Sequence, residues 1–143
     1  MKTVLILLGV LVILAAAAIV TNPSAEDHLL ETGISVDVEN YRVLSIGSVS
    51  YGDRSEVVSI GMFGKVITTK DPKVVGQQLQ FDRIAEDFVI SLTLESASGR
   101  ISSDQLNKIL DELALKRTAG YEVAIHYMDS VLTEISLQEL KSH

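Results

Sequence analysis

The chain opens on an unbroken apolar run, and shorter apolar and polar patterns follow it. The run is Val4 to Val20, "VLILLGVLVILAAAAIV", seventeen residues without a polar side chain. A helix rises about 1.5 Å per residue, so this run covers roughly 26 Å, just enough for a hydrocarbon core of about 30 Å. We therefore predict an N-terminal transmembrane helix that anchors the chain in a membrane through residues 4–20.

A cleaved signal peptide is the alternative interpretation of the same run. Such a peptide has a charged start, an apolar core and small residues before the cut, and Lys2 and Ala15–Ala18 fit that outline. Ile19 and Val20 continue the apolar run past the alanines, which favours a retained anchor. Either way the rest of the chain is exported. It is then single-pass in the cell membrane with its body outside the cytoplasm, or secreted or periplasmic after cleavage.

Charge predicts the orientation of the span. Lys2 is the only basic residue before Arg42, whereas Glu26, Asp27 and Glu31 follow the run. Basic residues stay on the cytoplasmic side of a membrane, so the body is predicted to face outward.

The turn sequence "TNPS" ends the run and begins a new element. Pro23 disfavours helix at the residue before it, and Ser24 is a helix cap with an acidic Asp27 three residues later. We predict a short helix over 25–32 that ends at Gly33. The predicted organisation is an anchor (or signal peptide) and juxtamembrane turn, 1–24, followed by one extracytoplasmic α+β domain, 25–143.

Two stretches rich in valine, isoleucine and serine come next, Tyr41–Ser50 and Ser55–Thr69, with the turn sequence "YGDR" between them. They predict a β-hairpin. Gly61 and Gly64 in the second stretch indicate a bulge or a close backbone approach. The alternating segment Ile34–Val38 predicts an earlier strand.

The remaining half predicts a β-α-β-β unit. Asp71 and Pro72 start a short helix that reaches about Leu79. The helix of the β-α-β-β unit is a second one, which begins after Ser102. Its start is the clearest local signal in this half, because Ser102 and Gln105 form a capping box. One apolar stripe lines this helix: Leu106, Ile109, Leu110 and Leu113. Three alternating segments predict the strands: Asp87–Glu95, Tyr121–Met128 and Val131–Leu137.

Composition narrows the chemistry. The chain has a net charge of −7, and the body after Ser24 has eleven basic against nineteen acidic residues, a net of −8. Such a body repels phosphate backbones, so no nucleic-acid partner is expected. The chain has no cysteine, which excludes disulfides, thiolate metal sites and cysteine nucleophiles.

The titratable residues suggest no catalytic, cofactor or metal site. His28 is expected to be a polar residue at the membrane surface, and His143 is terminal. His126 and Glu122 share one face of a predicted strand, where a solvated surface is a better interpretation than a metal site without a third ligand. The acidic cluster Asp82, Glu86 and Asp87 lacks a calcium-binding loop and is expected to be a solvated turn.

Met62 and Phe63 stand between two glycines. An aromatic residue placed in this way on an exposed strand is able to act as a docking knob, but such a residue belongs more often to the core, which is what we expect here.

The apolar span running into "TNPS" and the strand pair ending in "GMFG" resemble a bacterial family of small single-span proteins of unknown function. The matching positions are Thr21, Asn22, Pro23, Ser24, Gly61, Phe63 and Gly64. The resemblance covers the first half of the chain and implies topology and location, since the family has no assigned activity.

These observations predict a protein that is not an enzyme. It would be a membrane-tethered interaction or accessory module with a protein partner and no cofactor. One alternative is a structural subunit that assembles through its sheet edges. Another is a small exported hydrolase that uses Glu122, His126 or the cluster from Asp82 to Asp87.

Overall fold

The computed structural model describes residues 2–141, with side chains for residues 4–137. Within this range it contains five helices and one four-stranded antiparallel sheet, so the predicted α+β class is confirmed. The chain divides into two compact units, an N-terminal one that runs to Gly76 and a C-terminal one that starts at Gln77. The predicted boundary at residue 24 concerns the membrane and stays a prediction.

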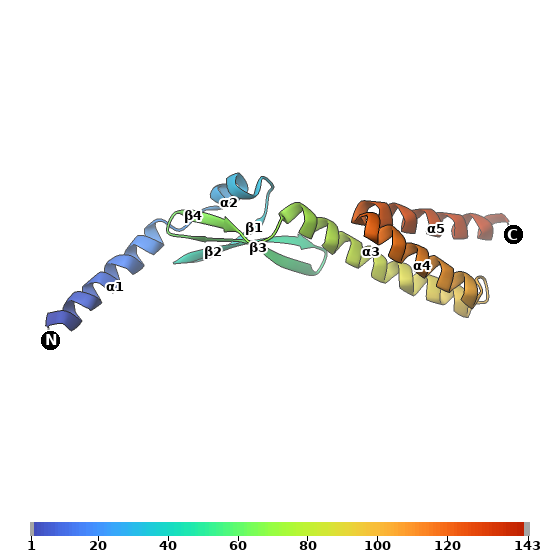
Figure 1. Ribbon diagram of the computed structural model, residues 1–143, viewed down its shortest axis with the longest axis horizontal. Helices are drawn as coiled ribbons and strands as arrows, with labels where there is room; N and C mark the ends of the chain where they lie inside the picture. The colour runs from blue at the N-terminus through green and yellow to red at the C-terminus, as the bar shows by residue number, and fades with distance from the viewer. Residues whose placement is uncertain (1, 142–143) are drawn as a thin grey trace. The chain divides into compact units, whose positions relative to one another are not determined.

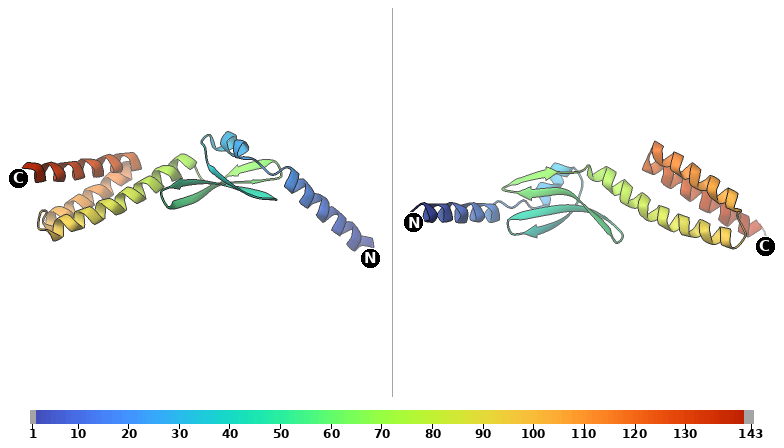
Figure 2. Two further views of the ribbon diagram at one scale, coloured as in Figure 1. Left: turned by 180° about the vertical axis from the view of Figure 1, so that it is seen from behind. Right: turned by 60° about the horizontal axis from the view of Figure 1, so that its bottom comes forward.

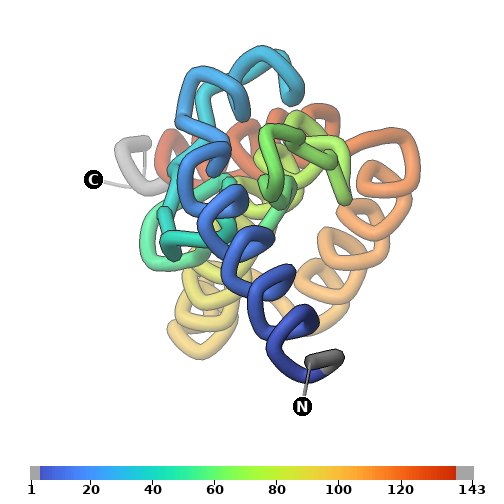
Figure 3. The backbone as a smooth tube through the Cα atoms, turned by 90° about the vertical axis from the view of Figure 1, so that its left-hand side faces the viewer, coloured from blue at the N-terminus to red at the C-terminus, as the bar shows by residue number. Residues whose placement is uncertain are grey.

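The N-terminal unit starts with two helices joined by a bend, α1 (Lys2–Val20) and α2 (Ala25–Thr32) (Figure 3). Among the described residues no single helix is long and apolar enough to qualify as a membrane span. A bent pair, Val4–Val20 with Ala25–Thr32 at 75°, qualifies on length and composition only.

The capped helix predicted after the proline is confirmed as α2. Ser24 Oγ accepts from the backbone N–H of Asp27, and Asp27 Oδ2 accepts from the N–H of Ser24 at 2.7 Å, so each residue satisfies a free donor of the other. Gly33 ends the helix in the left-handed region, with φ +71°, and its N–H donates to Leu29 O.

The sheet is a simple meander with the order β1-β2-β3-β4 (Figure 1). Its strands are β1 (Asp37–Tyr41), β2 (Leu44–Tyr51), β3 (Arg54–Met62) and β4 (Lys65–Thr68). The predicted hairpin is confirmed, because β2 pairs with β3 across the two-residue turn at 52–53. The strand predicted over residues 34–38 corresponds to β1, which begins three residues further along the chain, at Asp37.

The second stretch of that hairpin was predicted as one strand and is in fact two. Phe63 and Gly64 have φ of +54° and +73°, and two successive residues with positive φ make the tight turn that joins β3 to β4. Of the two alternatives for Gly61 and Gly64, the bulge is not found, because the register shift of the sheet lies between Gly47 and Ser48. The close approach is found at Gly61, where an added Cβ would lie 2.9 Å from both His28 Nε2 and Pro23 Cβ.

The C-terminal unit is helical, and the predicted β-α-β-β unit is wrong. Helix α3 (Pro72–Ala97) passes Gly76 without a break and includes the segment 87–95, while α5 (Tyr121–Lys141) includes both remaining predicted strands. Figure 2 shows these long helices from two sides. Buried core residues recur at helical spacing: Phe81, Phe88 and Leu92 in α3, and Ala124 and Met128 in α5.

The helix with the capping box is confirmed as α4 (Ser103–Ala119), since Ser102 and Gln105 exchange the two expected hydrogen bonds. The predicted apolar stripe is also confirmed, although it packs on helices rather than on a sheet. Leu113 belongs to the core cluster with Phe88, Leu92 and Met128, and the other stripe residues pack against that cluster.

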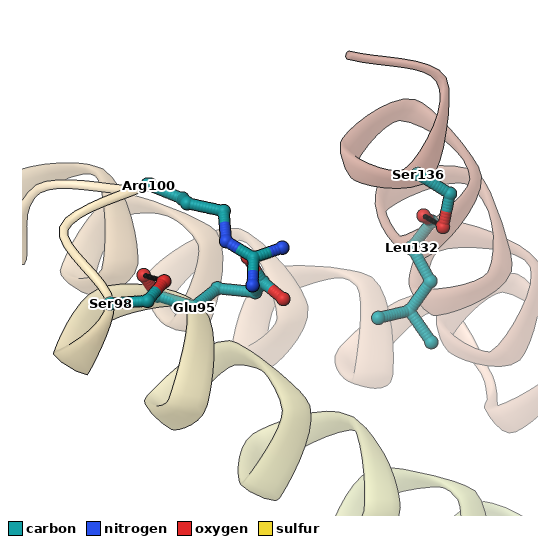
Figure 4. Close-up of polar contacts among 5 residues, drawn as sticks. All are labelled: Glu95, Ser98, Arg100, Leu132 and Ser136. Atoms are coloured by element: carbon teal, nitrogen blue, oxygen red, sulfur yellow. Dashed lines mark hydrogen bonds and ion pairs between the residues drawn. The ribbon is translucent and has the colours of Figure 1, made fainter. Parts of the chain in front are cut away.

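The connection between α3 and α4 is a compact turn (Figure 4). The N–H of Arg100 donates to Glu95 O, and Gly99 lies in the left-handed region with φ +77°. The guanidinium of Arg100 returns to the last turn of α3, where its Nε lies 3.3 Å from Glu95 Oε2. This turn ends α3 before the cap of α4 begins.

Candidate functional site

His28 is the largest of three fully buried polar side chains described in the N-terminal unit, the others being Ser45 and Ser59. It projects from α2 against the sheet and has no exposed surface. Its Nδ1 lies 2.7 Å from Ser59 Oγ and its Nε2 lies 2.8 Å from Ser45 Oγ. The prediction that His28 is a polar residue at the membrane surface is therefore wrong, because α2 turns this position toward the sheet.

Two glycines make room for the imidazole. In the sheet Ser45 is paired with Gly61 and Gly47 with Ser59, so serines and glycines occupy opposite corners of one small square. A Cβ on Gly47 would lie 2.7 Å from His28 Nδ1, and a Cβ on Gly61 would lie 2.9 Å from Nε2. We call these five residues the histidine clasp: His28, Ser45, Gly47, Ser59 and Gly61.

A signal for the clasp is present in the sequence. The tripeptide Ser-Ile-Gly occurs twice, at 45–47 and at 59–61. Antiparallel pairing of two identical tripeptides places each serine opposite a glycine, and both lie on the same face. The pattern was missed because the residue that it receives, His28, comes from a separate helix.

The clasp holds a neutral imidazole. Burial lowers the pKa of His28, and the nearby Asp27 carboxylate opposes this only in part. A neutral ring donates from one nitrogen and accepts at the other, and a serine hydroxyl is able to do either. Since both nitrogens are used inside the fold and the ring is closed to solvent, the geometry fits a structural role rather than a general base or a metal ligand.

We expect the stability of the N-terminal unit to depend on this protonation. The unfolded chain binds a proton at His28 near pH 6.5, while the folded chain resists it, so the free energy of unfolding falls as the pH drops below that value. Denaturant titrations of the detergent-solubilised chain between neutral pH and about pH 5 would measure the slope. His28→Gln should flatten the dependence of the free energy of unfolding on pH, whereas His126→Gln, at an exposed position, should leave it unchanged. Equal slopes in the parent and both variants would refute the assignment of this dependence to His28.

Gly61→Ala should destabilise the clasp. The added methyl would meet Ser45 Oγ, His28 Nε2 and Pro23 Cβ, the last two at 2.9 Å, and overpacking of this kind costs about 1–3 kcal/mol. Gly76→Ala is the matched control. Its methyl meets only Val49 Cγ1 at 3.6 Å, and alanine favours a helix. Hydrogen exchange of residues 44–62 would compare them, and equal protection in both variants would contradict the packing argument.

The positions of the family resemblance lie close together at one end of the sheet. The side chain of Asn22 donates to Asn40 Oδ1 at 2.7 Å and to Leu44 O at 3.3 Å. Pro23 is buried beside Gly61. A Cβ on Gly64 would lie 3.8 Å from Thr21.

Each residue of "TNPS" thus has a local task. Thr21 Oγ1 donates to Ala17 O at 2.7 Å, Asn22 and Pro23 hold the segment on the sheet, and Ser24 caps α2. The segment fixes the end of α1 to the N-terminal unit through side-chain contacts rather than through a flexible linker.

The face of the sheet opposite the clasp is open and apolar. Ile46, Ile60 and Ile67 form one row across three strands, and Leu44 and Met62 lie on the same face, two residues along from Ile46 and Ile60. Ile60, Met62 and Ile67 are 40%, 45% and 67% exposed. We call these five residues the open face.

The expectation that Met62 and Phe63 belong to the core is wrong. Phe63 is 50% exposed and sits in the turn between β3 and β4 with a positive φ, which a bulky residue rarely adopts. Both side chains therefore present apolar surface at the tip of a hairpin.

The other candidate residues lie on helices. His126, Asp129 and Ser130 line one shallow hollow on α5, but the Ser130 hydroxyl donates to the backbone carbonyl of His126 at 2.8 Å rather than to its ring. Glu122 accepts from the amide of Gln77 at 2.9 Å. A nucleophile activated by His126 would need a hydroxyl bonded to the imidazole, which this arrangement does not provide.

The acidic cluster lies in α3 rather than in a turn, and Arg83 pairs with Asp87 within that helix, with 3.8 Å between Nε and Oδ2. In the part of the chain that the structure describes, no three histidine, aspartate or glutamate side chains are grouped to hold a metal ion. His143 lies outside the described residues.

A groove of about 310 Å³ runs between α4 and α5. Ile109, Val131 and Ile135 are among its apolar lining, and Glu112 and Glu134 lie at its polar positions. Tyr127 also lines it, and burial together with the nearby Glu112 raises the pKa of its phenol to about 12. The tyrosine is therefore uncharged over the physiological range.

No family model matches the chain, and neither a curated protein nor a solved structure is similar enough to count as a match. The resemblance to the family of single-span proteins thus stays a prediction that rests on the seven motif positions.

Proposed function

We propose that this chain is a membrane-tethered, extracytoplasmic interaction module that binds a protein partner. The observation that carries the proposal is the open face. One side of the sheet is closed by α2 through the histidine clasp, while the other presents Ile60, Met62 and Ile67 to solvent. Contiguous exposed apolar surface of this kind is typical of a binding surface.

The tether in this proposal is α1. Its apolar side chains from Val4 to Leu14 are each about half exposed or more, on every side of the helix, which suits a helix surrounded by lipid. Lys2 before the span and the acidic residues after it favour an outward-facing body. Signal cleavage is the alternative, and the intact mass of protein from native membranes separates the two, because cleavage near Ala18 removes the whole span.

A binding role is favoured over a hydrolase by the way the histidines are used. Both nitrogens of His28 bond to buried serines, and the Ser130 hydroxyl near His126 bonds to the backbone. Assembly through sheet edges is the other alternative. It is disfavoured by both edge strands of the sheet, since short and charged edges resist pairing. Strand β4 has four residues and begins with Lys65, and β1 has five residues and includes Asp37 and Glu39.

Site-specific photocrosslinking in the native membrane tests the proposal. A photoreactive residue at Ile60 should capture a defined protein, and the capture should be lost when Ile67→Glu places a charge beside it. Ser55, exposed on the same strand, is the control position. Equal capture from Ile60 and Ser55, or capture that survives Ile67→Glu in a folded protein, would contradict binding through the open face.

A further inference from the structure

Two hairpin turns meet at the point where α1 leaves the sheet. The turn Arg42-Val43 joins β1 to β2, and Asn22 donates to the residues on either side of it, Asn40 and Leu44. The turn Phe63-Gly64 joins β3 to β4, and Gly64 lies against Thr21. Both views in Figure 2 place these ends of the sheet on the side of α1. The first residues after the apolar run therefore lie beside both turns.

The side chains at these two turns are unusual for loop tips. Large apolar or aromatic groups are well exposed there, and one basic residue accompanies each turn. The first tip carries Tyr41 (52% exposed), Arg42 and Val43 (39%), and the second carries Phe63 (50%) and Lys65, next to Met62 at the end of the open face. The third turn, at the far end of the sheet, is flanked by Tyr51 (39% exposed) and Arg54, but its two turn residues, Gly52 and Asp53, carry no large apolar side chain.

The backbone at both tips also departs from the usual pattern. Arg42 and Phe63 adopt φ of +49° and +54°, where glycine or asparagine is the ordinary choice, whereas Gly52 serves the far turn with φ +63°. A large side chain at such a position costs conformational energy that a glycine would avoid. Folding alone therefore does not explain an arginine and a phenylalanine at these two positions.

We propose that the two tips are immersed in the boundary between headgroups and acyl chains of the membrane that α1 enters. Aromatic and aliphatic side chains bury about 5–10 Å deep in this layer, and arginine and lysine extend from it to the lipid phosphates. Tyr41 and Phe63 would place their rings in the apolar part of this layer, and the tyrosine hydroxyl would lie near its polar surface. The inference rests on the proposed anchor, because Thr21 is the first residue after the span and lies next to Gly64 of the second tip.

Immersion of both tips would fix the sheet at the membrane surface by three points, namely α1 and the two hairpins. The open face and the clasp would then keep a constant orientation to the bilayer, whereas a single flexible tether would let them rotate.

Tryptophan fluorescence tests the proposal directly, because the chain has no native tryptophan. Four single-tryptophan variants of the full chain would be reconstituted in phosphatidylcholine vesicles whose lipids carry bromine near the top of the acyl chain or near its middle. Phe63→Trp and Tyr41→Trp report the two tips, Tyr51→Trp is an aromatic control at the far end of the sheet, and Leu11→Trp reports the anchor.

The expected result is loss of most of the emission of the tip variants with shallow bromine, together with a blue shift, while Tyr51→Trp keeps its emission. Leu11→Trp should lose its emission to bromine in the middle of the chain. If Leu11→Trp is quenched and both tips behave like Tyr51→Trp, the immersion is refuted and the anchor stands. If Leu11→Trp is not quenched in any vesicle, the anchor itself is refuted and the immersion with it.

Discussion

His28→Ala is expected to lower the free energy of unfolding of the N-terminal unit by about 3–5 kcal/mol. The change leaves a cavity in place of a ring that has no exposed surface. It also leaves the hydroxyls of Ser45 and Ser59 buried without their partner. Because a domain has only about 5–15 kcal/mol of stability in total, most of the protection of α2 and the sheet should be lost.

Hydrogen exchange of α2 and the sheet in the detergent-solubilised chain would measure this loss. Leu30→Ala is the matched control, since it lies on the same helix and is 77% exposed, and it should change the stability by less than about 0.5 kcal/mol. Similar exchange in both variants would show that α2 does not depend on the histidine.

His28→Phe separates the hydrogen bonds from the volume of the ring. The phenyl ring keeps most of the volume but leaves both serine hydroxyls unpaired, so a loss of about 1–3 kcal/mol for each buried group is expected. Adding Ser45→Ala and Ser59→Ala to this variant removes the unpaired groups and should recover part of the stability. No recovery would indicate that shape, rather than hydrogen bonding, holds the clasp.

Phe88→Ala should have an effect of similar size on the C-terminal unit. Phe88 is fully buried in the cluster with Leu92, Leu113 and Met128, and alanine in place of a buried phenylalanine costs about 3–5 kcal/mol. Because one side chain serves all three helices of that cluster, its loss should destabilise α3, α4 and α5 together.

Ile90→Ala is the control for Phe88. The two residues are on one face if the segment is a strand and on different faces if it is a helix, and Ile90 is 54% exposed in α3. Thermal melts followed by circular dichroism should show a large shift for Phe88→Ala and almost none for Ile90→Ala. Equal shifts would favour the alternating pattern and contradict the helical assignment.

The sequence predicted those elements whose signal is local. Ser24 with Asp27 and Ser102 with Gln105 are capping boxes that need no distant partner, and both helices begin where they were expected. The hairpin of β2 and β3 was predicted for the same reason, since a two-residue turn with glycine joins two β-branched stretches.

The wrongly predicted elements are those whose structure depends on residues outside the short segment that was considered. Over the nine residues 87–95 the sequence alternates as a strand does, and Phe88 with Leu92 fits both a period of two and a helical spacing of four. Only the extension back to Phe81 shows the helical repeat. The turn at Phe63 was missed because glycine is the expected residue at a positive φ.

The candidate site could be predicted only in part. Gly61, Pro23 and Gly64 were singled out by the resemblance; Gly61 lies against Pro23, and Gly64 lies beside Thr21 at the end of α1. His28 was misplaced because a histidine beside an aspartate on a short surface helix gives no sign of burial; the two serines and two glycines that receive it lie 17 to 33 residues away.

Thiol labelling shows whether α1 tethers the module outside the cytoplasm. The chain has no cysteine, so a single cysteine introduced at Ser55 or at Thr3 is the only site for a membrane-impermeant maleimide. In spheroplasts that retain the protein in the membrane fraction, we predict that Ser55→Cys reacts at once and that Thr3→Cys reacts only after permeabilisation. Labelling of Thr3→Cys with protection of Ser55→Cys, or loss of the Ser55→Cys protein into the soluble fraction, would contradict the account.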